Sequence, residues 1–135
     1  MRYKIIGDSC LDLTKEMRKD PCYSMIPLTL MVGERHFVDD ETFVQKEFIK
    51  AVKEYPECPK SACLSPEMFK EAYCCEEENV FVITLSAALS GSYNSAVLAK
   101  SLYEEEHGKK NILVLDSKSA SSGQLNIAMY IRELC

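Results

Sequence analysis

Two short, uninterrupted apolar runs constrain the fold more than any other feature of the sequence. Residues 79–85 read NVFVITL and residues 112–116 read ILVLD. Strands with one solvated face alternate apolar and polar residues, whereas strands buried on both faces are apolar throughout, as in parallel sheets covered by helices. A stretch with helical spacing, Ser92 to about His107, lies between the two runs. The sequence therefore predicts an α/β domain built on a mainly parallel sheet flanked by helices.

The remaining segments alternate between strand and helix signals. Residues 24–32 and 35–40 flank the dipeptide Gly33-Glu34, which is typical of a β-hairpin turn, so we expect a hairpin inserted into the α/β framework. Ser65-Pro66 combines an N-cap residue with a proline at the first helical position, and Thr42 followed by Gln45 matches a capping box. The other expected elements are a strand at 3–7 and helices at 13–19, 43–55, 66–75 and from about 124 onward.

The length and the charge of the chain limit the classes of function. A chain of 135 residues forms one ordinary domain, and it contains no repeat or low-complexity tract. The net charge of -5 and the scattering of Lys and Arg among acidic residues argue against a nucleic-acid surface. No apolar segment has the length of a signal peptide core or of a membrane span. We therefore expect a cytoplasmic protein without an integral membrane segment or a nucleic-acid partner.

The cysteines do not indicate a metal or redox site. The chain has seven cysteines, an odd number, and no two of them form a CxxC pair. Four of them could form a zinc site only with a spacing that zinc proteins do not use: Cys58, Cys63, Cys74 and Cys75. We expect reduced thiols that pack as small apolar side chains, with no metal and no cofactor.

Three polar loops follow the expected strands at the end where parallel sheets bind ligands. The first strand ends in Asp8-Ser9, the strand at 79–85 runs into LSAALSGS, and the last strand ends in Asp116-Ser117. In open α/β sheets, ligands bind at the carboxyl ends of the strands. A single Asp-Ser pair is typical of an Asx or N-cap turn. Its recurrence at one edge favours a shared binding site.

The element Ser90-Gly91-Ser92 lies where a strand passes into a helix. At such a point, unpaired backbone N–H groups and the positive end of the helix dipole face outward, and serine hydroxyls add further donors. Glycine lets a ligand approach the backbone, so the element suits an anion. The alternative is that Ser92 is a simple helix N-cap. Ser86 and Ser90 are not needed for a cap, which favours a binding site.

The pattern around these serines lacks the partners that catalysis needs. A P-loop requires a second glycine and a lysine, and a nucleophile elbow requires G-x-S-x-G; residues 89–96, LSGSYNSA, match neither. A serine nucleophile also needs a histidine base, and His36 and His107 are expected on the hairpin and at a helix end. The pattern favours a holder of a carboxylate or a small phosphate over a reaction centre. Two alternatives stay open: an enzyme that acts on a phosphorylated or carboxylated metabolite at the same strand edge, and an interaction domain whose serines are only caps.

Taken together and in order, these motifs resemble the N-terminal domain of the DegV family of bacterial fatty-acid-binding proteins. The combination of SG[ST]-aromatic-x-SA with a later DSK is the specific part of the resemblance. The segments that carry it span the whole chain: Asp8-Ser9, Ile26-Pro27-Leu28 with Asp39 after the hairpin, Lys60-Ser61 before the helix that begins at Pro66, Leu89 to Ala96, Asp116-Ser117-Lys118 and Ser122-Gly123-Gln124.

The resemblance implies that the chain is a lipid carrier and not itself an enzyme. In this family a long-chain fatty acid lies in a tunnel between two domains, hydroxyl groups hold its carboxylate, and some members present it to a separate ATP-binding kinase subunit that makes an acyl phosphate. Carried onto this chain, the resemblance implies carboxylate contacts from Ser61 and from the turn formed by Ser90, Gly91 and Ser92. Asp8-Ser9 and Asp116-Ser117 are expected to shape the same edge.

The chain also departs from the family pattern. Lys60 and Ser92 stand where the family usually has threonine; the serine keeps a hydroxyl, whereas the lysine replaces one by a cation. Residues 1–135 are expected to form the N-terminal head-group-binding domain alone, with the second domain of the family absent from this chain. We therefore expect an exposed apolar face and self-association of the isolated domain.

Overall fold

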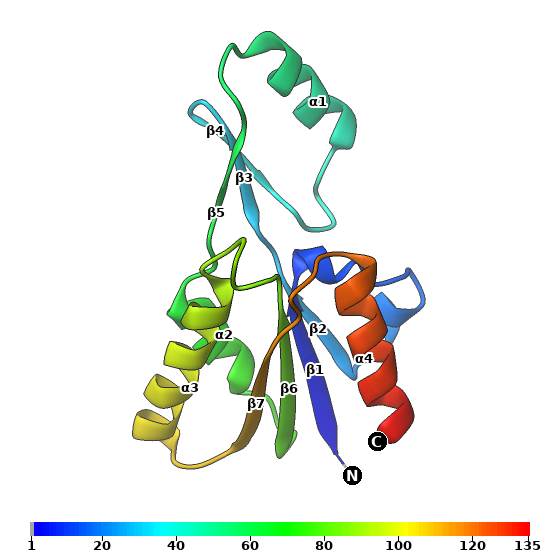
Figure 1. Cartoon of the computed structure of the whole chain (residues 1–135), viewed down its shortest axis with the longest axis vertical. Helices are drawn as coiled ribbons and strands as arrows, with labels where there is room; N and C mark the ends of the chain where they lie inside the picture. The colour runs from blue at the N-terminus through cyan, green and yellow to red at the C-terminus, as the bar shows by residue number, and fades with distance from the viewer. Residues whose placement is uncertain (1) are drawn as a thin grey trace.

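The computed structural model describes residues 2–135 and contains a helix-covered parallel sheet and a smaller antiparallel sheet (Figure 1). None of the helices within residues 2–135 has the length and apolarity needed to cross a membrane. The elements are, in chain order, β1 (Tyr3–Asp8), the 3-10 turns η1 (Ser9–Leu11) and η2 (Met17–Lys19), β2 (Tyr23–Ile26), β3 (Thr29–Val32), β4 (Arg35–Val38), α1 (Gln45–Glu54), β5 (Lys60–Ala62), α2 (Pro66–Tyr73), β6 (Asn79–Thr84), α3 (Ser92–His107), β7 (Asn111–Asp116) and α4 (Ser122–Leu134).

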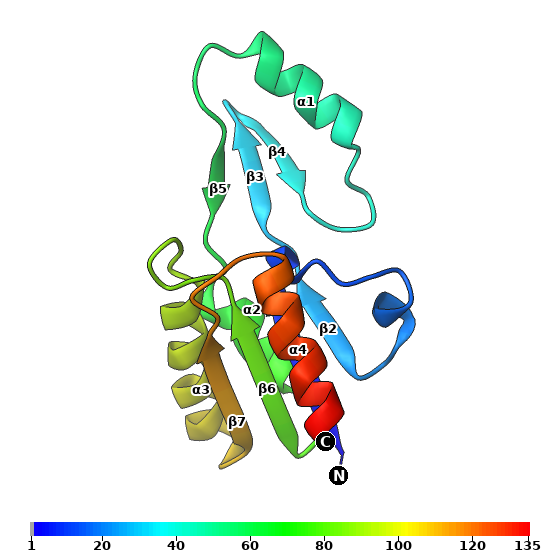
Figure 2. The same cartoon turned by 45° about the vertical axis from the view of Figure 1, so that its right-hand side comes forward.

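The main sheet is parallel throughout and has the strand order β2-β1-β6-β7. The helices α2 and α3 cover one face, and α4 with the η1 turn covers the other (Figure 2). Successive residues of the central strands serve opposite faces, so Ile6 and Val82 pack in the first core, and Ile5 and Ile83 in the second. Burial on both faces explains the uninterrupted apolar run of β6 and confirms the predicted α/β fold with a mainly parallel sheet.

The predicted hairpin insertion is confirmed as part of the second sheet. β3 pairs antiparallel with β4 on one side and with β5 on the other. Gly33 has a φ of 59° at the β3–β4 turn, a left-handed conformation that glycine adopts without steric cost. This sheet and α1 stand beyond the C-terminal ends of the main-sheet strands (Figure 1). The second sheet therefore faces the edge at which the polar loops are expected.

Two strand predictions need correction. The sequence predicts one strand over residues 24–32, but Pro27 and Leu28 divide it into β2 of the main sheet and β3 of the small sheet. The backbone N–H of Leu28 donates to Ser9 Oγ (3.1 Å), so a side chain takes the place of a ladder partner at the break. Residues 60–62 lie between the helices expected at 43–55 and 66–75, where no strand is expected, yet they form β5 because β3 offers them a free edge.

Two helix predictions are also wrong in detail. The capping box does not form, because Thr42 Oγ1 donates to Asp40 Oδ1 (2.6 Å) and α1 begins after Val44 without a side-chain cap. Within the helix predicted over 13–19, only the short turn η2 is helical. By contrast, the N-cap at Ser65 is confirmed, since its hydroxyl accepts the backbone N–H of Met68 (3.4 Å).

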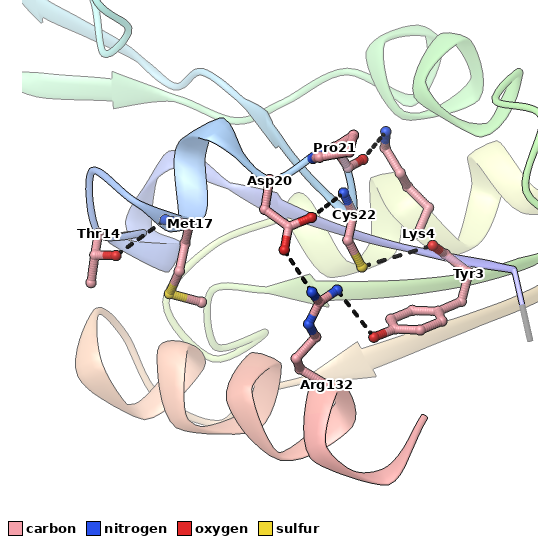
Figure 3. A network of polar contacts seen from close by, with 8 residues as sticks. All are labelled: Tyr3, Lys4, Thr14, Met17, Asp20, Pro21, Cys22 and Arg132. Atoms are coloured by element: carbon pink, nitrogen blue, oxygen red, sulfur yellow. Dashed lines mark hydrogen bonds and ion pairs between the residues drawn. The ribbon is translucent and has the colours of Figure 1, made fainter.

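A polar network fixes the C-terminal part of α4 against the start of β1 (Figure 3). Arg132 pairs with Asp20 (2.8 Å) and donates to Tyr3 Oη (3.4 Å). Asp20 also accepts the backbone N–H of Cys22 (2.9 Å), which joins the turn before β2 to the same network. These contacts lie at the end of α4 remote from the polar loops, so the opposite end of the helix is the one that borders the candidate site.

Candidate functional site

The three polar loops leave the main sheet at one edge, as the sequence predicts. β1, β6 and β7 are adjacent and parallel, so the loops that follow them emerge next to one another (Figures 1 and 2). The two strands that follow β1 in the main sheet, β2 and β6, lie on opposite sides of it, which makes the C-terminal end of β1 a topological switch point. Ligands of open α/β sheets bind in the crevice at such a point.

Asp8 fills this switch point with its own carboxylate. The side chain is fully buried. Oδ2 accepts the backbone N–H of Leu85 (2.6 Å), and Oδ1 accepts the N–H of Cys10 (3.1 Å) and Nε2 of Gln124 (3.1 Å). Burial raises the pKa of Asp8 above its ordinary value, although the three hydrogen bonds oppose the shift. The place where a ligand anion would lie is therefore taken by a carboxylate of the protein itself.

Asp116 and Ser117 bind backbone groups in a similar way at the end of β7. Asp116 Oδ1 accepts the N–H groups of Ala87 (3.0 Å) and Lys118 (2.9 Å), and these bonds lower the pKa of Asp116. Ser117 Oγ accepts the N–H of Ser119 (3.2 Å) and donates to its carbonyl (3.1 Å). Asp116 thus holds the neighbouring loop through Ala87, whereas Ser117 holds its own loop through Ser119.

The loop between β6 and α3, residues 85–91, is called the serine loop below. All of its backbone N–H groups donate hydrogen bonds within the chain. The N–H groups of residues 85 to 92 all donate within the chain, in order, to Asp8 Oδ2, the Ser119 carbonyl, Asp116 Oδ1, Ser86 Oγ, the Ser86 carbonyl twice, Cys63 Sγ and Ser90 Oγ. The prediction that free N–H groups at this turn receive an anion is therefore wrong for these residues. Among residues 85–92, only side-chain hydroxyls are left as donors for a ligand.

Two serine hydroxyls at the end of the serine loop form a hydrogen-bonded pair. Ser90 Oγ and Ser92 Oγ lie 3.0 Å apart, and Ser90 Oγ also accepts the N–H of Ser92 (3.2 Å). Ser92 is fully buried and Ser90 is partly exposed. Each hydroxyl carries one hydrogen, so the mutual bond uses one and leaves the other free. When Ser92 donates to Ser90, the hydrogen of Ser90 is available to an anion.

The N-cap alternative for Ser92 is not what the structure has. Gly91 occupies the N-cap position of α3, with no side-chain cap, and Ser92 is the first residue of the helix. A Cβ at Gly91 would lie 3.3 Å from Cys63 Sγ, which is a tight contact. Glycine at this position therefore allows the serine loop to approach the segment before α2.

Cys63 joins the segment that carries Ser61 to the hydroxyl pair. Cys63 Sγ accepts the N–H of Gly91 (3.4 Å) and lies 3.8 Å from Ser90 Oγ. Ser61 is exposed on β5, opposite Leu30 of β3. The β5–α2 segment contacts the serine loop through Cys63. Within residues 2–135, the Ser61 side chain itself makes no hydrogen bond to the serine loop. Sequence reasoning missed Cys63, and its place two residues after Ser61 was the available signal.

The serine loop takes no part in the pocket beside β2. A pocket of about 130 Å³ lies beside β2, with Arg18, Tyr23, Asp39 and Glu41 in its lining, and no serine-loop residue lines it. Within residues 2–135, no group of three or more His, Cys, Asp or Glu side chains is placed to hold a metal ion. The candidate site is thus an edge of the main sheet that carries the Ser90–Ser92 hydroxyl pair.

Comparison with known proteins identifies one family. Residues 2–135 match the family described as DegV, a family of uncharacterised proteins. The chain is 38% identical over 122 residues to a DegV domain-containing protein of Streptococcus gordonii, a match that covers 89% of this chain and 43% of that protein. The chain therefore spans less than half the length of the curated relatives that it matches.

Two solved structures of similar proteins contain fatty acids. A DegV family protein of Ruminococcus gnavus ATCC 29149, refined with vaccenic acid, is 44% identical with a TM-score of 0.95, over 99% of this chain and 48% of that one. The Fatty Acid Kinase (Fak) B3 protein of Streptococcus pneumoniae, loaded with linoleic acid, is 37% identical with a TM-score of 0.77, over 89% of this chain and 43% of that one.

Proposed function

Because the chain belongs to the DegV family, we propose that its serine loop holds the carboxylate of a long-chain fatty acid. The observation that carries the proposal is the Ser90–Ser92 pair: when the buried serine donates within the pair, the partly exposed one keeps a free hydrogen. A carboxylate accepts such a hydrogen, and a bond to a charged acceptor is shorter and stronger than one between neutral groups. The fatty acids in the two solved relatives support this assignment.

In this proposal Ser61 supplies a second hydroxyl from β5. The contact of Cys63 with Ser90 and Gly91 brings the chain after Ser61 to the serine loop, and the Ser61 side chain is exposed and open to a ligand. Gly91 completes the turn and keeps it close to Cys63. In this proposal the Asp-Ser pairs at positions 8–9 and 116–117 shape the same edge through their bonds to the backbone.

In the proposal, the apolar tail extends beyond this chain. The similar proteins are about twice as long as the matched segment, which leaves a second part of similar size to cover the tail. An open edge with hydroxyl donors suits a head group, whereas some fifteen methylenes need apolar walls on several sides. We therefore propose a tunnel between this domain and a second domain.

We propose presentation of the ligand rather than catalysis. The groups around the hydroxyl pair are a thiol and backbone amides, and none of these serves as the base that a serine nucleophile needs. A separate ATP-binding kinase subunit then phosphorylates the presented carboxylate to an acyl phosphate in the cytoplasm. The name of the similar Streptococcus pneumoniae protein, Fatty Acid Kinase B3, supports this partner.

Mass spectrometry of the ligand that copurifies with the natural protein at its full length tests the proposal. We expect a long-chain fatty acid in the wild type and a lower occupancy in Ser90→Ala. Ser101→Ala, on the exposed surface of α3, is the control that keeps the wild-type occupancy. A polar phosphorylated or carboxylated metabolite in place of the lipid would support the enzyme alternative. A protein that carries no ligand and binds no added fatty acid would contradict the proposal and favour an interaction domain.

A further inference from the structure

Two carboxylates, from the strands β1 and β7 on either side of β6, hold the serine loop, and they hold it in different ways. Asp8 uses both of its oxygens and receives three donors, from Leu85, Cys10 and Gln124. Asp116 uses Oδ1 alone and receives two backbone donors. Asp8 is fully buried as well. Comparing variants of Asp8 and Asp116 therefore shows how each carboxylate affects the position of this loop.

Asp8 stands where a ligand anion binds in other sheets of this kind. The C-terminal end of β1 is the switch point, and the N–H of Leu85, the first donor of the serine loop, is already bonded there to Asp8 (2.6 Å). A second anion at this point would meet the charge of Asp8 at close range in a buried setting, which is strongly unfavourable. A ligand carboxylate is therefore kept from the strand ends and finds its donor at Ser90.

Gln124 joins the start of α4 to the same carboxylate. Its side chain is fully buried, and Nε2 donates to Asp8 Oδ1 (3.1 Å). Oε1 of Gln124 has no hydrogen-bond partner within residues 2–135. Asp8 is thus the group that orients this buried amide, and through it the position of α4 is tied to the serine loop.

We propose that Asp8 is a positioning residue for the head group of the ligand. It fixes the serine loop through the N–H of Leu85 and fixes α4 through Gln124, and its charge directs the ligand carboxylate toward the Ser90–Ser92 pair. This inference rests on the proposed function of the loop. Asp8 does not touch the ligand, so its effect is seen in how well the hydroxyl pair receives the carboxylate.

Asp→Asn changes separate the two carboxylates. Asp116→Asn keeps an oxygen that accepts both donors of Asp116, so the contact survives. Asp8→Asn leaves a single acceptor oxygen for donors that arrive at both positions, so a buried N–H loses its acceptor. In the natural protein at its full length, we expect Asp8→Asn to weaken binding of a long-chain fatty acid about tenfold, and Asp116→Asn to weaken it less than about twofold.

A neutral ligand separates positioning from a general loss of structure. A fatty alcohol of the same chain length keeps the tail and lacks the carboxylate. We expect the dissociation constant of the alcohol to change less than about twofold in Asp8→Asn, while that of the acid rises about tenfold. Equal weakening of acid and alcohol, or wild-type binding of the acid by a folded Asp8→Asn protein, overturns the proposal.

Alkylation of Cys63 reports the position of the loop without any ligand, because Cys63 Sγ accepts the N–H of Gly91. Peptide mass spectrometry should show faster Cys63 alkylation in Asp8→Asn and an unchanged rate in Asp116→Asn. Equal rates in all three proteins count against a positioning role. If the wild type binds neither acid nor alcohol, the proposed function fails, and these rates still decide whether Asp8 positions the loop.

Gln124→Met serves where Asp8→Asn does not fold. Methionine has a similar volume, removes one donor from Asp8 and also removes the unpaired Oε1, so the fold is expected to tolerate it. We expect about threefold weaker binding of the acid with unchanged binding of the alcohol, because the remaining two donors still hold Asp8. Unchanged acid binding in Gln124→Met overturns the proposal in that case.

Discussion

At the scale of single residues, the buried Ser92 and the partly exposed Ser90 have different roles in the site. A fully buried hydroxyl is costly unless it finds a partner, and Ser92 finds one in Ser90 Oγ at 3.0 Å. When Ser92 donates within the pair, Ser90 Oγ accepts from both the hydroxyl and the backbone N–H of Ser92, so its own hydrogen points away from both. In that arrangement Ser92 orients Ser90, and of the two paired hydroxyls only Ser90 has a hydrogen left for the ligand.

Replacing Ser90 by alanine should remove one charge-assisted hydrogen bond and leave the tail contacts intact. Such a bond contributes about 1.5–3 kcal/mol, so we expect Ser90→Ala to weaken fatty-acid binding roughly ten- to hundredfold in the natural protein at its full length. Isothermal titration calorimetry measures the change, with Ser101→Ala as the unaffected control. A complete loss of binding would show that the tail contributes less than the head group, contrary to the proposal.

At the scale of elements, the start of α3 is held in place by α2. Tyr73 of α2 is fully buried, and its hydroxyl donates to the carbonyl of Ala96 in α3 (2.9 Å). Ala96 and Phe69 belong to the same apolar core as Tyr73. Since Ser92 is the first residue of α3, this contact between α2 and α3 also sets the position of the hydroxyl pair.

Tyr73→Phe tests this contact because it removes the hydroxyl and keeps the ring. We expect the free energy of unfolding to fall by about 0.5–1.5 kcal/mol, the usual contribution of one buried hydrogen bond. Urea denaturation of this chain gives the value. Tyr130→Phe is the matched control, since the Tyr130 side chain is 62% exposed and its change should leave stability unaltered. A Tyr73→Phe protein as stable as the control would show that the bond contributes nothing.

The elements that follow from local sequence were predictable, and those that depend on distant partners were not. The apolar runs of β6 and β7 and the cap at Ser65 are local signals, and the structure has these elements. The strand β5 depends on the free edge of β3, and the break at Leu28 depends on the hydroxyl of Ser9, nineteen positions away. Neither partner is visible in a window of a few residues.

The candidate site divides in the same way. The sequence predicts that the loops after β1, β6 and β7 share one edge, because parallel strands end together. It does not predict that the carboxylates of Asp8 and Asp116 each take a backbone N–H group of the serine loop, since those bonds join residues 77 and 29 positions apart. Cys63 was missed for the same reason, because its contact with Ser90 spans 27 positions.

At the scale of the whole molecule, one side of the main sheet is incompletely covered. Figure 2 shows α4 in front of β1 and β6, while β7 lies beside it without a helix on that side. Leu113 of β7 is 51% exposed. Leu115, two residues further along, packs against the core under α4 but is only partly buried there. Met129 and Tyr130 of α4 are exposed as well. We propose that a second domain covers this side in the longer protein.

The uncovered side should make the 135-residue chain self-associate or bind hydrophobic dyes. Sedimentation velocity and dye fluorescence measure the two effects. Leu113→Ser should lower both, because it replaces an exposed apolar side chain at the centre of the uncovered strand, whereas Ser101→Ala on α3 should change neither. A chain that stays monomeric at all concentrations and binds no dye would contradict the expectation.

In the proposed function, the apolar tail of the ligand decides how tightly the ligand binds. A tail of roughly fifteen methylenes at about 0.8 kcal/mol each contributes about 12 kcal/mol before ordering costs, several times the contribution of one hydroxyl. If two domains share the tail, this chain covers about half of it, and a loss of about 6 kcal/mol weakens binding more than ten-thousand-fold. We therefore expect the 135-residue chain to bind a long-chain fatty acid poorly or not at all, and the twice longer Ruminococcus gnavus relative to bind it well. Calorimetry on both proteins measures the difference, and equally tight binding by this chain would show that the tunnel does not need a second domain.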